Sequence, residues 1–228
     1  MSARRVVVLA VMILCLGTLS LARDGENRSS AAGDNTPGKF ELKRAANGQF
    51  FFNLKAANGQ GRLADICRQW EKAFYSVAAA ETRRILFRIG IVLGRDGGAL
   101  PLLAHYTRWF LGGAAGNGRQ YISWVHLADL VRMFRLALQY DNFFDGTYNA
   151  VAPNPATNAE FMRTLRHALY RPWCPPAPAW AIRLGCKLTG TEASLALDGC
   201  RCAPKRFLES GFEFKFTELR AALKEIHP

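Results

Sequence analysis

Segments with strand and helix patterns alternate along the chain from residue 61 onward, and this alternation limits the fold more than any other sequence feature. Apolar residues recur at helical spacing over residues 63–77. Residues 84–93 form an apolar run interrupted by one arginine, which is typical of a buried strand. A strand over residues 121–125 leads into a helix over residues 127–138. This alternation favours an α/β fold in which helices cover a sheet.

Local signals predict further elements. Residues 100–110 favour a helix that tolerates Pro101 in its first turn. The pattern from Thr157 to Glu160 is a capping box, which predicts the start of another helix. Over residues 212–216, phenylalanines alternate with charged residues, which predicts a half-buried strand. The other predicted segments are a strand at 147–151, a terminal helix at 219–226, and loops at 94–98, 112–118 and 172–178.

A near-repeat precedes this region, because AANGQ occurs at residues 45–49 and again at 56–60. Asn-Gly is a strong hairpin signal, since both central turn residues must accept a positive φ. Residues 39–44 and 49–55 are therefore predicted to pair as two strands. An isolated hairpin is marginally stable in water, so another element is expected to cover it.

The amino terminus has the pattern of a signal peptide over residues 1–22, followed by a polar linker over residues 23–37. A basic Arg4-Arg5 pair precedes the apolar run at 6–16, and small residues at Ser20 and Ala22 suit cleavage. The pattern predicts export, to the periplasm or outside the cell. A membrane anchor stays open as an alternative, because residues 6–22 reach the lower limit of length for spanning a bilayer. If the segment is neither a signal peptide nor an anchor, we expect the chain in the cytoplasm.

A third interpretation makes the same run the first strand of a nucleotide-binding sheet. That role requires a Gly-x-Gly-x-x-Gly turn, whose backbone approaches the pyrophosphate of the dinucleotide. Only Gly17 follows the apolar run, so we reject this interpretation of the run as the first strand of a nucleotide-binding sheet.

Composition predicts a packed protein, since 50% of the 228 residues are hydrophobic and 21% are charged. The formal net charge of +12 favours anionic partners such as nucleic acid, acidic lipid or a dinucleotide phosphate. The basic residues are scattered and match no nucleic-acid-binding motif, so we do not expect nucleic acid as a partner.

The cysteines match no metal site, because Cys174, Cys186, Cys200 and Cys202 lack the Cys-x-x-Cys spacing of zinc ligands. One disulfide among these residues stays open if the chain is exported. We favour incidental cysteines and expect no metal.

Five stretches in order carry a resemblance to a known family. They are ADICRQWE at 64–71, FRIGIVLGRDGGAL at 87–100, GRQYISWVHLADLVR at 118–132, APNPATNAEF at 152–161 and PKRFLESGFEFKFTELRAAL at 204–223. Residues 61–228 thereby resemble the YfcH-like epimerase family of extended short-chain dehydrogenase/reductases, without its amino-terminal Rossmann half. The resemblance implies an α/β segment at 61–175 with an incomplete Rossmann sheet, and a small carboxy-terminal domain at 176–228. The hairpin at 38–60 resembles a fragment of the YegP-like domain of unknown function.

The epimerase resemblance implies NAD or NADP as cofactor and suggests the binding residues. Arg88, Ile89 and Gly90 match the strand end that lies near the nicotinamide in the family. Arg119 and Gln120 fall in a substrate-side loop, where the arginine fork suits an anionic substrate group or a cofactor phosphate.

Alternative roles remain for the residues of this loop and the strand after it. Arg119 would hold the loop in place if it formed an ion pair with Asp129. Trp124 is expected in the core. His126 is included among the candidate substrate residues, and we expect it to form a hydrogen bond at the helix entry rather than act as a base.

The chemistry of the family relies on a Tyr-x-x-x-Lys pair and on a glycine-rich diphosphate turn. Leu63 and Cys67 stand at the Tyr and Lys positions, and neither supplies that chemistry. The sequence therefore predicts a substrate-side segment that is not catalytically self-sufficient, with no catalytic residue assigned. The alternative is an exported ligand-binding or interaction module, whose unfinished sheet edge pairs with a second copy or a partner chain.

Overall fold

The computed structural model describes residues 5–12, 40–44, 50–54, 62–76, 82–139, 145–189 and 197–227. The chain divides into a larger unit, Met1–Thr18 with Ala78–Pro228, and a smaller unit, Leu19–Val77. Residues 176–228 thus share a unit with residues 78–175.

The smaller unit contains a hairpin and a helix. Strands β2 (Phe40–Arg44) and β3 (Phe50–Leu54) pair antiparallel, with Phe40 opposite Leu54. Helix α1 (Arg62–Ser76) follows. The predicted hairpin and helix are confirmed, while the Asn-Gly turn itself lies outside the described residues.

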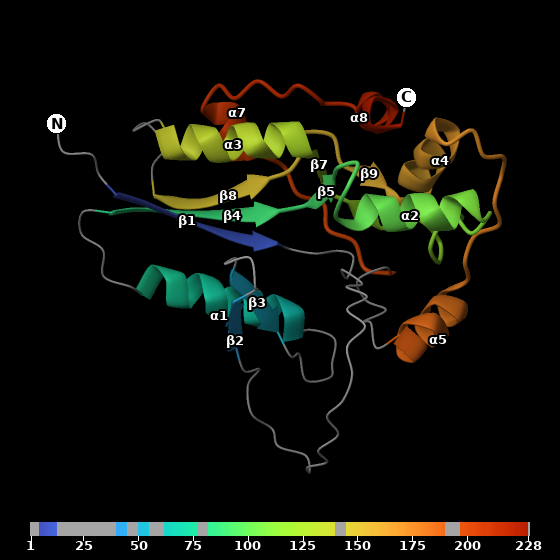
Figure 1. Cartoon of the computed structure of the whole chain (residues 1–228), viewed down its shortest axis with the longest axis horizontal. Helices are drawn as coiled ribbons and strands as arrows, with labels where there is room; N and C mark the ends of the chain where they lie inside the picture. The colour runs from blue at the N-terminus through green and yellow to red at the C-terminus, as the bar shows by residue number, and fades with distance from the viewer. Residues whose placement is uncertain are drawn as a thin grey trace, which may run out of the picture. The chain divides into compact units, whose positions relative to one another are not determined.

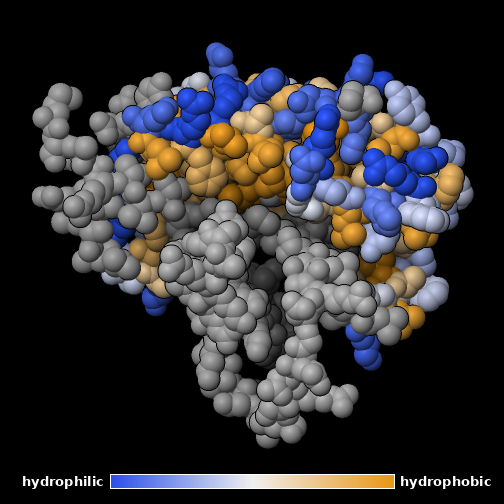
Figure 2. Space-filling view, in the orientation of Figure 1, coloured by the Kyte–Doolittle hydropathy of each residue, from blue (hydrophilic) through white to orange (hydrophobic). Residues whose placement is uncertain are grey.

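The centre of the larger unit is a parallel sheet in the order β1-β4-β8 (Figure 1). Its strands are β1 (Arg5–Met12), β4 (Thr82–Ile89) and β8 (Gly146–Ala150). Helices α3 (Leu127–Gln139) and α7 (Lys205–Glu209) bury Met133 and Phe207 against Ile85 and Phe87 of β4. Figure 2 shows hydrophilic side chains along the α3 rim and hydrophobic ones beneath it. The predicted α/β fold with a parallel sheet is confirmed.

Strand β1 contradicts our rejection of a strand in the apolar run near the amino terminus. Its backbone pairs parallel with β4, from Arg5 opposite Thr82 to Met12 opposite Ile89. The rejection was wrong about the strand, because a glycine-rich turn is needed to bind a dinucleotide, whereas strand pairing needs only a run of suitable residues. The signal peptide and its cleavage stay predictions. Among the described residues, no helix has both the length and the apolar character needed to span a bilayer.

The predicted strand over residues 84–93 is interrupted at Gly90, where the chain changes its pairing partner. Strand β4 pairs with β8, whereas β5 (Ile91–Leu93) pairs with β7 (Trp124–His126). The Gly90 N–H donates to the Ala150 carbonyl at 3.3 Å, and the Ile91 N–H donates to the Ser123 carbonyl at 2.8 Å. The continuous-strand prediction was wrong because composition reports burial but not the identity of the neighbouring strand.

The strand predicted over residues 121–125 is divided in the same way, at Ser123. Strand β6 (Tyr121–Ile122) pairs antiparallel with β9 (Ala156–Thr157), and β7 continues beside β5. The polypeptide therefore turns from one small sheet into another at Ser123.

A second core lies around β5 and β7. Its covering helices are α2 (Ala99–Arg108), α4 (Asn158–Ala168) and α8 (Leu219–Ile226), which contribute buried residues including Leu100, Phe161 and Leu223. The Oγ1 of Thr157 accepts a hydrogen bond from the Glu160 N–H at 3.2 Å, which confirms the predicted helix start. Helix α5 (Ala179–Thr189) was not predicted.

The segment over residues 212–216 is not a strand, contrary to the alternating pattern. The N–H groups of Lys215 and Phe216 each donate to the Asp129 carboxylate at 2.9 Å. A carboxylate thus takes the place of a neighbouring strand as hydrogen-bond acceptor. Asp129 is buried and also pairs with Arg132 at 3.0 Å, so the suggested ion pair between Asp129 and Arg119 was wrong.

Candidate functional site

The glycine-rich loop before β6 is tied to the first turn of α4. The side-chain oxygen of Asn158 accepts a hydrogen bond from the Ala115 N–H at 2.7 Å. The Asn158 N–H donates to the Gln120 carbonyl at 2.8 Å, and the Ala159 N–H donates to the Gly118 carbonyl at 3.0 Å. Asn158 therefore organises this loop, although only its place after the Thr157 cap could have indicated it from sequence.

The two predicted substrate residues of this loop have different surroundings. Gln120 donates its side-chain amide to the Ala115 carbonyl at 2.9 Å, so this amide helps to close the loop. Arg119 is exposed, and its backbone N–H donates to the Asn117 side chain at 3.0 Å. Arg119 thus lies at the surface beside the start of α4.

A cavity of about 430 Å³ lies next to this loop, between the start of α4 and the connector that follows that helix. The residues that define its chemistry are Thr157, Glu160, Arg163, Arg166 and Trp173. Arg166 donates to the Gly112 carbonyl at 2.7 Å, which holds it against the loop. The side chain of Arg163 is exposed to solvent. Two guanidinium groups beside an exposed indole suit an anionic ligand that has a flat or apolar part.

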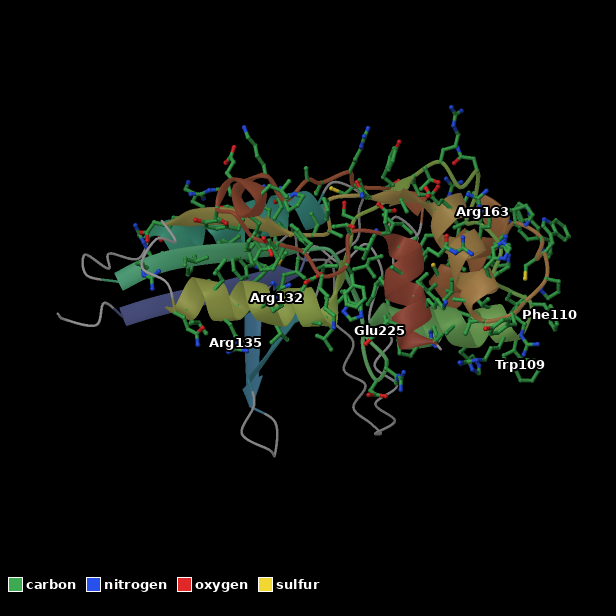
Figure 3. All side chains as sticks on the ribbon, turned by 90° about the horizontal axis from the view of Figure 1, so that it is seen from above. Trp109, Phe110, Arg132, Arg135, Arg163 and Glu225 are labelled. Atoms are coloured by element: carbon green, nitrogen blue, oxygen red, sulfur yellow. The ribbon has the colours of Figure 1, made fainter. Side chains whose placement is uncertain are left out.

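A second, more open cavity of about 350 Å³ adjoins α3. Arg132 and Arg135 contribute to it, and the Arg132 guanidinium lies 5.1 Å from the centre of the Phe212 ring. Figure 3 shows these two arginines on α3, whereas Arg163 lies at the end of the unit that carries Trp109 and Phe110. Because Arg132 already pairs with Asp129, the cavity beside α4 is the stronger candidate.

His126 does not join Arg119 and Gln120. Its Nδ1 accepts from the Ala128 N–H at 3.2 Å, and its Nε2 lies 3.2 Å from Glu225 Oε2. The imidazole also packs on Phe216, with 3.9 Å between the ring centres. The prediction of a hydrogen bond at the helix entry is confirmed.

Trp124 was expected in the core. It is fully buried, and its indole N–H donates to the Asn154 carbonyl at 2.9 Å. This prediction is confirmed.

The strand end assigned to a nicotinamide is occupied by protein contacts. Ile89 and Gly90 are buried, and the N–H groups of Gly90 and Ile91 donate to carbonyls of neighbouring strands. A Cβ added at Gly90 would overlap the Ser123 carbonyl oxygen and lie 2.9 Å from a Val151 methyl group. Packing therefore requires a glycine at this position.

The third residue of the cofactor assignment, Arg88, lies on the same strand. Arg88 is half-buried on β4, opposite Asn149 of β8. Leu63 and Cys67 lie one turn apart on α1. The cofactor role of Arg88, Ile89 and Gly90 stays a prediction. Among the described segments, no group of three potential metal ligands occurs.

The parallel sheet and its covering helices define an α/β protein, and the cavity beside α4 is its candidate ligand site. A family described as "Domain of unknown function (DUF1731)" matches residues 177–226, inside the predicted segment 176–228. The chain is similar to the chloroplastic epimerase family protein SDR39U1 homolog of Arabidopsis thaliana, with 38% identity over 175 residues. This match covers 77% of the chain and 49% of the relative.

Animal relatives and solved structures agree with this similarity. Epimerase family protein SDR39U1 of Mus musculus is 38% identical over 72% of the chain and 55% of its own length. The crystal structure of human SDR39U1 (isoform 2) with NADPH has a TM-score of 0.66 and 36% identity, and the match covers 72% of this chain and 54% of that one.

A distant neighbour, the UDP-glucose 4-epimerase of Thermus thermophilus in complex with NAD, shares the fold, with a TM-score of 0.55 and 13% identity over 97% of this chain and 64% of that one. The chain spans about half the length of the curated relatives it matches. The comparisons support the resemblance to the extended epimerase family, and the YegP-like resemblance stays a prediction.

Proposed function

We propose that this chain is the substrate-side segment of an epimerase-family, NAD(P)-dependent oxidoreductase-like protein, and that it does not complete catalysis alone. The observation that carries the proposal is its similarity to human SDR39U1, whose structure contains NADPH, over 72% of this chain but 54% of that one. Leu63 and Cys67 replace the proton-transferring tyrosine and its lysine, and the end of β4 is filled by packing.

Cofactor binding tests this proposal directly. We expect the purified full chain to show no saturable NADPH binding in the micromolar range when nucleotide fluorescence is titrated. A full-length epimerase-family relative, titrated under the same conditions, provides the positive control. Cooperative thermal unfolding of the same sample would show that the chain is folded. Saturable micromolar binding would contradict the proposal.

The substrate class that we propose is a small anionic molecule bound beside α4. Arg163 supports this because its guanidinium lines the cavity and is exposed to solvent, while Arg166 contributes charge and Trp173 an apolar face. Arg119 lies on the adjoining loop, which is bonded to Asn158 and Ala159. Charge-assisted hydrogen bonds to an anion are stronger than neutral ones.

We expect Arg163→Ala to weaken binding of inorganic pyrophosphate, used as an anionic probe, by about tenfold, since one charged hydrogen bond contributes about 1.5 kcal/mol. Isothermal titration calorimetry would measure the change. Arg119→Ala should weaken pyrophosphate binding more than His126→Ala, because both ring nitrogens of His126 already contact protein groups, the Ala128 N–H and the Glu225 carboxylate. Arg135→Ala removes an equal charge on α3 and is the matched control. An equal loss in Arg135→Ala, or no binding by the unchanged protein, would refute the assignment of the cavity.

Export is also part of the proposal, supported by the amino-terminal sequence pattern. Self-association is proposed because an unfinished sheet edge can pair with another chain. Cleavage after Ala22 would remove β1 and leave the β4 edge that it occupies free to pair with another chain. Amino-terminal sequencing of the mature protein therefore distinguishes an exported form from one that retains β1.

A further inference from the structure

Cys200 and Cys202 bring two thiols into contact. Their Sγ atoms lie 3.0 Å apart, and both residues are reduced and partly exposed. They belong to a segment without helix or strand structure, on either side of Arg201. The two thiols are separated by a single residue, and the contact brings them to the same side of the backbone. The Arg201 guanidinium lies 4.9 Å from the centre of the Tyr121 ring.

The backbone on which these thiols stand is anchored at the junction of β6 and β7. The Cys200 N–H donates to the Tyr121 carbonyl at 3.0 Å. The Ser123 hydroxyl donates to the Cys200 carbonyl at 2.7 Å and accepts from the Cys202 N–H at 2.9 Å. One serine thus holds both cysteines, so their proximity does not depend on a freely moving loop.

We infer that Cys200 and Cys202 are a redox-modification site, a dithiol that peroxide oxidises to an intramolecular disulfide. One thiol attacks hydrogen peroxide, forming a sulfenic acid and releasing water. The second sulfur then attacks the sulfenic sulfur, which forms the S–S bond and releases a second water. Two sulfurs lose two electrons in total, and both thiol protons leave in water. The Sγ atoms need to approach by about 1 Å to reach the length of a disulfide bond.

Other chemistry fits this pair less well. A tetrahedral metal site needs further ligands, and no group of three His, Cys, Asp or Glu side chains suited to a metal occurs in the described part of the chain. Cys174 is 2% exposed and its thiol faces the Pro172 carbonyl, so it is poorly placed to react with peroxide.

The pair is connected to the strand junction of the fold. Ser123, which holds both cysteines through its hydroxyl, also accepts the Ile91 N–H with its carbonyl. Formation of the disulfide is therefore expected to affect the backbone at the position where β4 ends and β5 begins. This inference uses no cofactor and does not depend on the proposed function.

The test uses the reduced full chain, treated with hydrogen peroxide, alkylated, digested and analysed by mass spectrometry. We expect a Cys200–Cys202 disulfide within one peptide and an alkylation of both residues that is lower by about tenfold, recovered after reduction. Cys200→Ser should lose the disulfide and leave a sulfenic acid at Cys202, whereas the control Cys186→Ser should retain it.

Two results would overturn the inference. Full alkylation of both residues in the peroxide-treated protein is the first, and pairing of either residue with a different cysteine is the second. Peptide mapping of the unchanged protein decides between these outcomes even where Cys200→Ser does not fold.

Discussion

Replacing Asp129 with alanine is expected to reduce the free energy of unfolding by about 1–3 kcal/mol, the cost of leaving a buried hydrogen-bond donor without its acceptor. Asp129 is 0% exposed, and its carboxylate accepts the N–H groups of Lys215 and Phe216 while pairing with Arg132. Its removal leaves two backbone donors without their acceptor in the segment that leads to α8. Urea denaturation followed by tryptophan fluorescence would measure the loss.

Two further variants make this prediction specific to the buried carboxylate. Asp129→Asn keeps one oxygen acceptor and should fall between the alanine variant and the unchanged protein. Asp96→Ala removes an exposed carboxylate from the loop before α2 and should change stability by no more than about 0.5 kcal/mol. If Asp129→Ala matched Asp96→Ala, residues 212–216 would not depend on this carboxylate.

Gly90→Ala is the second change with a large expected effect, a destabilisation of about 3 kcal/mol or failure to fold. The new Cβ would overlap the Ser123 carbonyl oxygen and crowd Val151. Two of the atoms that it meets belong to the Ser123 backbone, which is held in place by the Ile91 N–H, so rotation of a side chain cannot relieve the overlap.

Gly97→Ala is the matched control, because a Cβ at Gly97 meets no atom within 4 Å. Thermal unfolding of the two variants should therefore differ clearly, with Gly97→Ala close to the unchanged protein. Equal melting temperatures would show that the approach between Gly90 and Ser123 is looser than the structure indicates.

Local patterns predicted the elements whose signals are contained in a few neighbouring residues. The helical spacing of apolar residues anticipated α1 and α3, and Thr157 anticipated the start of α4. The hairpin of β2 and β3 followed from its Asn-Gly turn signal. These signals are short in range, because side-chain periodicity and capping depend on residues within one or two turns.

Contacts between residues that are far apart in the sequence decided the features that local patterns did not predict. A phenylalanine alternation typical of a strand became an irregular segment because Asp129, 86 residues from Lys215, accepts its N–H group. Asn158 gained its role from Ala115, 43 residues away. The candidate cavity likewise depends on α4 and the following connector lying beside a loop from earlier in the chain.

The sequence by itself determined the α/β class, the capped helix and the resemblance to an epimerase family, since these depend on local pattern and on motifs in order. Only the tertiary structure decided that β1 joins the sheet, that Gly90 serves packing, and that the thiols of Cys200 and Cys202 meet beside Ser123. The physical reason is that a residue's type sets which bonds it can form, whereas the fold selects its partners.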